Sequence, residues 1–119
     1  MKNIETRVHR QRLIIEARYS IDINKETVRN YLLELANELQ MHIYIPEPII
    51  LSATGHGKPI HDGYEGVIFW VESGAVIYIW ERLKFLTVDI YSCKPFNNEK
   101  AIEFTKNLFK LTEIEFLII

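Results

Sequence analysis

Residues 66–93 read GVIFWVESGAVIYIWERLKFLTVDIYSC and hold three apolar runs separated by two short polar breaks. The runs GVIFWV, AVIYIW and FLTVDIYS are rich in β-branched and aromatic residues, which is typical of β-strands. Glu72 and Ser73 lie at the first break, and the only cysteine of the chain, Cys93, ends the third run. This stretch therefore predicts the centre of a β-sheet, and it could bring one hydroxyl and one thiol into a single small site.

Strand and helix signals flank this stretch on both sides. Residues 12–21 are rich in strand-forming residues, and Asp22 or Asn24 can cap the helix that follows. The apolar stripe of that helix consists of Val28, Tyr31, Leu32, Leu35, Ala36 and Leu39. A second helix, capped by Asn97 or Asn98, carries Ala101, Phe104, Leu108 and Phe109 on one face, and residues 113–119 predict a last strand.

The remaining segment holds an edge and a loop. Residues 42–45 and 49–53 are apolar runs split by two prolines, which predicts a bend or a sheet edge. Residues 54–64 hold three glycines and read as a loop. The resulting order β-α-β-β-β-β-α-β predicts an α/β (α+β) two-layer sandwich, a largely antiparallel sheet with two helices on one face. We expect a single domain over residues 1–119.

Hydrophobic patterning also predicts a partner. In GVIFWV and AVIYIW both alternate positions are apolar or aromatic, so both faces of the sheet should be covered. Two helices cover only one face. We therefore expect a homodimer formed through the sheet.

Composition limits the remaining classes of partner. The chain has 119 residues, 48% of them hydrophobic, and a formal net charge of −2, which argues against a nucleic-acid surface. The N-terminus is too polar for a signal peptide, and charges interrupt every apolar run before it reaches a membrane span. A soluble, cytoplasmic protein with no nucleic-acid or membrane partner is expected.

Individual side chains leave several chemistries open. Ser73 could be a nucleophile if a base and an oxyanion stabiliser lie beside it, but it has no G-x-S-x-G elbow, so a hydrolase is not indicated. Cys93 could be a proton donor or a small buried residue. His56 and His61 share the loop 54–64 without the usual spacing of a zinc site, so no metal is expected.

Taken together, residues 66–93 resemble the core of the prokaryotic S-adenosylmethionine decarboxylases, which are pyruvoyl-dependent. Members of that family carry Gly-Val, Glu-Ser-His, Ile-His-Thr-Trp-Pro-Glu and Ala-Val-Asp-x-(Phe/Tyr)-Thr-Cys-Gly in this order. The positions in register here are Gly66-Val67, Glu72-Ser73, Ile77, Trp80, Val88-Asp89, Tyr91 and Cys93. The segment Ala53 to His56 is similar to the family's Ser-Thr-Phe-His. By this resemblance His56, together with Trp80 of the core segment, is a candidate ligand-binding residue.

The resemblance implies a self-cleaving chain with a role in polyamine biosynthesis. Cleavage between Glu72 and Ser73 would turn Ser73 into a pyruvoyl group, which is the cofactor of the family. Cys93 would then be the proton donor in decarboxylation. Without cleavage the chain would carry no cofactor.

This sequence departs from the family where the reaction needs its base and its small hydroxyl. Tyr78 replaces the processing histidine, and Glu65 replaces the processing serine. A tyrosine pKa of about 10, against about 6.5 for histidine, leaves little base at neutral pH. A carboxylate beside a developing oxyanion has the wrong sign of charge to stabilise it. Gly74 and Lys94 also replace a histidine and a glycine of the family.

Three functions follow. The first is a divergent family member impaired in self-processing and decarboxylation, which keeps the fold to bind an S-adenosylmethionine-like ligand or to pair with an active paralogue. The second is an active pyruvoyl-dependent decarboxylase of S-adenosylmethionine or an amino acid, in which Tyr78 or a loop histidine folded over Ser73 supplies the base. The third is a non-catalytic structural or interaction domain.

Overall fold

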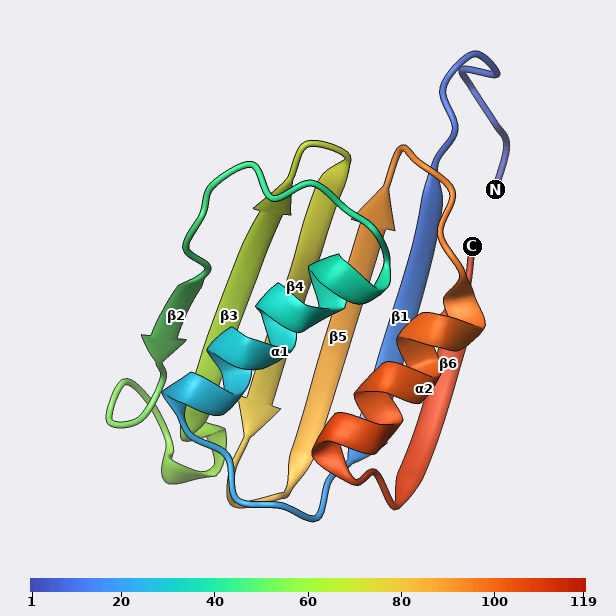
Figure 1. Ribbon diagram of the computed structural model, residues 1–119. Helices are drawn as coiled ribbons and strands as arrows, with labels where there is room; N and C mark the ends of the chain where they lie inside the picture. Colours follow the sequence, from blue (N-terminus) through green and yellow to red (C-terminus); the bar gives the residue numbers. More distant parts are fainter.

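A six-stranded sheet with two helices on one face makes up the computed structural model, which describes residues 1–119 (Figure 1). The strands are β1 (Gln11–Arg18), β2 (Ile49–Ser52), β3 (Gly63–Trp70), β4 (Ser73–Trp80), β5 (Phe85–Ser92) and β6 (Glu113–Ile118), and the helices are α1 (Lys25–Glu38), α2 (Asn98–Phe109) and the short 3-10 turn η1 (Pro59–His61). Their order across the sheet is β2-β3-β4-β5-β1-β6, with every neighbouring pair antiparallel. The predicted α/β sandwich and its order of elements are confirmed.

Asparagine side chains set where both helices begin. The Asn24 side chain accepts a hydrogen bond from the backbone N–H of Thr27, and the Thr27 hydroxyl accepts one from the Asn24 N–H. Asn24, rather than Asp22, is therefore the cap of α1. Asn97, rather than Asn98, caps α2 by accepting from the N–H of Lys100.

Two predicted strands differ in the structure: one is shorter at its C-terminal end, and the other does not form. β1 stops at Arg18 instead of residue 21, because its partner strand β5 begins at Phe85, directly opposite Arg18; the Tyr19 N–H makes one last bond in this register, to the Lys84 carbonyl. Residues 42–45 form no strand and make a single antiparallel bridge, between Ile43 and Trp70. The prolines that follow prevent this segment from continuing into the ladder of β2.

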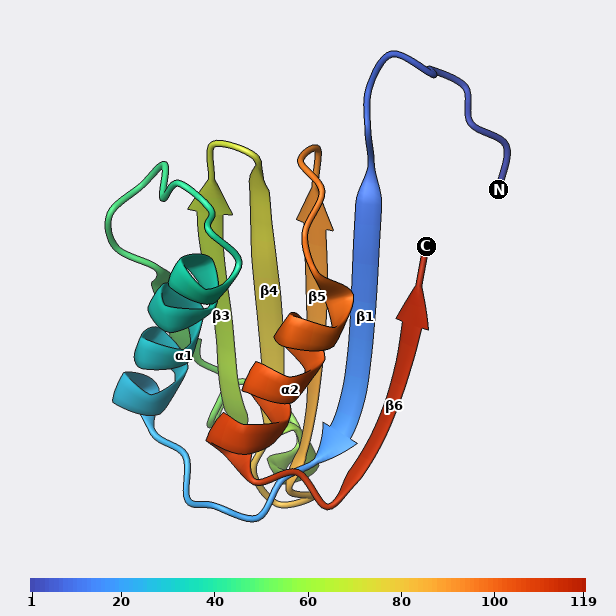
Figure 2. The ribbon, with the colours of Figure 1, turned by 45° about the vertical axis from the view of Figure 1, so that its right-hand side comes forward.

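The apolar core lies between the sheet and the helices. Both helices lie on the same side of the sheet, in front of its strands in both views (Figures 1 and 2). Leu13, Ile77 and Val88 are fully buried beneath them. At Gly66 the first helix comes so close that an added Cβ would lie 2.8 Å from the Val28 side chain, so β3 accepts only glycine at this position without a shift.

The other face of the sheet, which we call the open face, carries large apolar side chains. The strand register places Val67 against Val76 and Phe69 against Gly74 on this face. Its exposed large apolar residues include Ile49, Leu51, Phe69, Tyr78, Tyr91 and Leu117. This face is open to solvent in a single chain. Neither helix has the length and apolar character needed to cross a bilayer.

One polar pair joins the two helices inside the core. The Tyr31 hydroxyl lies 2.8 Å from the Thr105 hydroxyl, and both side chains are buried. Thr105 donates its only hydrogen to the Ala101 carbonyl, so Tyr31 must be the donor in the shared bond. Burial is the main cause of the raised pKa of Tyr31, and the bond to Thr105 opposes it.

We predict unequal losses when the two partners are removed one at a time. Thr105→Val leaves the buried Tyr31 hydroxyl without an acceptor and should lower the free energy of unfolding by about 1–3 kcal/mol. Tyr31→Phe leaves Thr105 bonded to Ala101 and should cost about 1 kcal/mol or less. Urea unfolding of both variants measures the difference, and an equal or reversed order of losses contradicts this account.

Candidate functional site

The Glu72-Ser73 bond lies in a tight hairpin. β3 ends at Trp70 and β4 begins at Ser73, so the turn consists of Val71 and Glu72. Ser73 pairs with Trp70 on one side and with Ser92 on the other. Ser73 is half-buried and is the first residue of β4, and the β3–β4 hairpin lies at the upper end of the sheet in Figure 1.

Backbone strain is concentrated just after this bond. Ser73 has φ +140° and Gly74 has φ +155°, in a region that residues with side chains rarely adopt. For Ser73 such a conformation costs of the order of 1–3 kcal/mol, so the surrounding contacts must hold it in place. A Cβ added to Gly74 would lie 2.2 Å from the Ile68 carbonyl oxygen. The backbone therefore admits no histidine at position 74 without a shift.

The carbonyl group of Glu72 has a donor in place. The backbone N–H of Cys93 donates to the Glu72 carbonyl oxygen at 2.9 Å. A hydrogen bond of this kind polarises the carbonyl and would stabilise an oxyanion formed on it. The Cys93 thiol is exposed. The structure thus brings Glu72, Ser73 and Cys93 together.

A residue that the sequence did not reveal also binds Glu72. The Glu72 carboxylate accepts hydrogen bonds from the His42 backbone N–H at 3.0 Å and from the His42 Nδ1 at 2.7 Å. Burial raises the pKa of Glu72, but the hydrogen bonds from His42 outweigh it, so the pKa of this carboxyl lies below its ordinary value. His42 belongs to a short run that shows no periodic pattern, and thirty residues separate it from its partner. No signal in the sequence pointed to this pair.

Tyr78 and Glu65 lie elsewhere. They oppose each other in the β3–β4 ladder, and both are exposed on the open face. Tyr78 follows Ser73 by five positions, which is roughly 16 Å along a strand. The expectation that Tyr78 could act as the base for Ser73 is therefore not met within one chain.

The loop histidines are farther still from Ser73. The loop joins β3 at Gly63, which pairs with Trp80 at the opposite end of β4 from Ser73. The interpretation that His56 or His61 folds over Ser73 is wrong within one chain, because the loop 54–64 lies at the lower end of the sheet in Figure 1.

At that lower end four of the predicted site residues share one cavity. Its volume is about 300 Å³, and its lining includes His56, Glu65, Tyr78 and Trp80. The Trp80 indole N–H donates to Nδ1 of His61 at 3.2 Å, which ties the loop to the sheet. The rings of Tyr78 and Trp80 have centroids 6.3 Å apart. Two predicted groups of residues thus occupy the two ends of β4.

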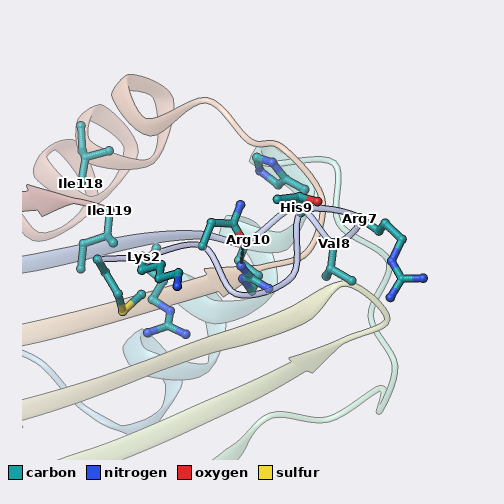
Figure 3. Close-up of a pocket in the computed structure, with 11 residues that line it drawn as sticks. Lys2, Arg7, Val8, His9, Arg10, Ile118 and Ile119 are labelled. Carbon is teal, nitrogen blue, oxygen red and sulfur yellow. Dashed lines mark hydrogen bonds between the residues drawn. The ribbon is translucent and has the colours of Figure 1, made fainter.

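A larger hollow of about 760 Å³ lies between the N-terminal segment and the end of β6. Lys2, Arg7 and Arg10 line it, but Arg7 points away from the others (Figure 3). No cluster of three or more His, Cys, Asp or Glu side chains that could hold a metal ion forms anywhere in the chain.

An antiparallel sheet with both helices on one face places the chain among the two-layer α/β proteins. The sequence model of the S-adenosylmethionine decarboxylase family matches residues 15–119. The chain therefore belongs to the S-adenosylmethionine decarboxylase family, as the resemblance of residues 66–93 predicted. This family is pyruvoyl-dependent.

The fold is also similar to a solved structure, that of the adenosylmethionine decarboxylase from Aquifex aeolicus VF5. The TM-score is 0.74, and the match covers 94% of this chain and 89% of the other. Sequence identity is 17%, so this likeness concerns the fold alone. No curated protein matches the chain in sequence.

We predict a pH-dependent contribution of Glu72 to stability. Because the pKa of Glu72 in the folded chain lies below the ordinary 4.5, its ionised form stabilises the fold above that pH, and this contribution is lost as pH falls through the folded-state pKa. The difference in free energy of unfolding between wild type and Glu72→Gln should be constant near neutrality and shrink below about pH 4.5. In a His42→Leu background the effect should be smaller, because the side-chain hydrogen bond is lost while the backbone N–H of residue 42 still donates to the Glu72 carboxylate. A difference that stays constant from pH 7 to pH 3 contradicts the assignment.

Proposed function

We propose that this chain is an S-adenosylmethionine decarboxylase-related protein that binds an S-adenosylmethionine-like cation and self-cleaves at Glu72-Ser73 slowly, if at all. One observation carries the proposal: Glu65 and Tyr78 line a cavity with Trp80 and His56 at the end of β4 remote from Ser73. These two residues replace the processing serine and histidine of the family. Because Glu65 and Tyr78 line a cavity and lie far from Ser73, we expect them to bind a ligand rather than to activate Ser73.

The chemistry of the cavity favours a positively charged organic ligand. Tyr78 and Trp80 present aromatic rings, whose faces attract cations, and Glu65 adds a carboxylate. A sulfonium or ammonium group combined with a planar base matches both features. The volume of about 300 Å³ is at the lower end of the range for small-molecule sites. Glu65 is thus unfavourable for an oxyanion but favourable for this ligand.

Slow processing follows from what surrounds Ser73. The hairpin keeps the strained backbone and the Cys93 N–H donor. Among the residues tied to it there is one imidazole, and the Nδ1 of that ring is already bonded to Glu72. A pyruvoyl group would derive from Ser73, and the residues expected to help form it lie about 16 Å away in the same chain.

An active decarboxylase of S-adenosylmethionine or an amino acid is the second candidate. The hydrogen bond from the Cys93 N–H to the Glu72 carbonyl favours it, because this donor lies where an oxyanion would form. In this function Cys93 would be the proton donor, and cleavage would go to completion.

A second copy of the chain is the partner that we propose for the open face. Phe69, Tyr78 and Tyr91 are each more than a third exposed there, and Ile49 and Leu51 extend the apolar surface to the edge at β2. Burying such a surface against an identical one would give a two-fold symmetric dimer. An active paralogue of the same fold would use the same face.

We predict that S-adenosylmethionine binds to the intact chain. Calorimetric titration should show heat, and saturating ligand should raise the melting temperature. Glu65→Gln and Trp80→Leu should each weaken binding by about tenfold, the usual effect of losing one charged or aromatic contact to a cation. Glu103→Gln, an exposed change on α2, is the matched control and should leave the affinity unchanged.

Two results would contradict this proposal. Absence of heat and of any melting shift would favour a structural or interaction domain. Rapid, complete conversion of the intact 14.1 kDa chain into fragments 1–72 and 73–119, with pyruvate on the second, would favour the active decarboxylase.

We also predict that the open face mediates dimerisation. Sedimentation velocity should show a dimer for the wild type and a monomer for Phe69→Lys, because a lysine within the buried face would leave an unpaired charge. Glu103→Lys makes a comparable surface change on the helix side and should remain dimeric. A monomeric wild type would refute the proposed interface.

A further inference from the structure

Glu72 is held at both its side chain and its backbone. Its two carboxylate oxygens accept from the His42 N–H and from the His42 Nδ1, at 3.0 and 2.7 Å. Its carbonyl oxygen accepts from the Cys93 N–H at 2.9 Å. The side chain of Glu72 is only 12% exposed. The residue that would give up its acyl group in self-cleavage is therefore among the most restrained in the hairpin.

The backbone fixes the position of His42. The Val71 N–H donates to the His42 carbonyl at 2.8 Å, and the Tyr44 N–H donates to the Phe69 carbonyl at 2.9 Å. The Lys94 ammonium donates to the Gln40 carbonyl at 2.8 Å, which ties the same segment to the residue after Cys93. The segment 40–44 is thus anchored to the β3–β4 hairpin and to Lys94, the residue after Cys93. The His42 ring itself is 75% exposed.

The hydrogen bond also fixes the tautomer of His42. An ionised carboxylate only accepts hydrogen bonds, and the lowered pKa of Glu72 keeps it ionised at neutral pH. The proton of a neutral His42 ring must therefore be on Nδ1. Removing this donor would leave a half-buried carboxylate with one hydrogen bond fewer, free to rotate away.

We propose that His42 is the positioning residue for reaction at the Glu72-Ser73 bond. It holds Glu72 so that the carbonyl group stays against the Cys93 N–H while Ser73 keeps its strained backbone. In the first step the Ser73 hydroxyl oxygen bonds to the Glu72 carbonyl carbon, the Glu72-Ser73 C–N bond breaks, and the hydroxyl proton passes to the Ser73 nitrogen. The product is an ester with a free amine, and no other reactant is needed. This inference rests on the slow self-cleavage in the proposed function.

Hydroxylamine provides a direct test, because it attacks an ester far faster than an amide. Trapping the ester yields fragment 1–72 as a hydroxamate and fragment 73–119 with a free serine amine. The full chain and its variants are incubated with hydroxylamine at neutral pH for days, and intact mass spectrometry follows the fragments. We expect slow fragment formation from the wild type and none from Ser73→Ala.

Variants at His42 separate positioning from general stability. His42→Leu should slow fragment formation by about tenfold or more, as expected for loss of a charge-assisted hydrogen bond. His42→Asn, whose amide nitrogen can take the place of Nδ1, should recover most of the rate. His42→Gln, whose amide lies one bond farther out, should not. All three side chains are at an exposed position, and melting curves establish that each variant is folded.

Either of two outcomes overturns the inference. Fragment formation by His42→Leu at the wild-type rate would show that the hydrogen bond does not position Glu72. Absence of fragments from the wild type would show that there is no reaction to position. Neither outcome touches ligand binding in the cavity of Glu65 and Trp80, so a failure here is distinguishable from a failure of the proposed function.

Discussion

The register of β4 between β3 and β5 is the constraint on which the other features depend. Side chains alternate along a strand, so a slip of one residue would exchange the core face and the open face. In the observed register Ala75, Ile77 and Ile79 are buried beneath the helices. The same register leaves Tyr78 opposite Glu65 on the open face and Ser73 opposite Trp70 at the hairpin. Burial of one apolar row thus determines where Ser73, Tyr78 and Glu65 lie.

This register divides the candidate chemistry between the two ends of one strand. At the hairpin end, backbone strain, a backbone N–H donor and a carboxylate–imidazole pair surround the Glu72-Ser73 bond. At the other end, aromatic rings and the Glu65 carboxylate line a cavity. A strand is too stiff and too extended to bring its ends together. The two groups therefore remain apart within a single chain.

Much of the fold was predictable because its signals are local. The apolar stripe of α1, the runs of β3, β4 and β5, and the asparagine caps each depend on residues within a few positions of one another. Where the prediction was wrong, a longer-range contact decided. β1 ends at Arg18 because its partner strand β5 begins opposite it at Phe85, and residues 42–45 make one bridge instead of a strand.

The sequence by itself determined the family, the order of elements and the position of the Glu-Ser junction. The family resemblance rests on residue spacing within residues 66–93 and is confirmed by the family match, whereas the order of elements rests on local patterns along the whole chain. Only the tertiary structure decided which candidates meet. It separates Tyr78 from Ser73, gathers Glu65 with Trp80, and brings His42 to Glu72 across thirty residues. The physical reason is that these contacts depend on which strands pair, in which register, and on where the chain reverses. The local sequence pattern specifies neither the pairing partner nor the register.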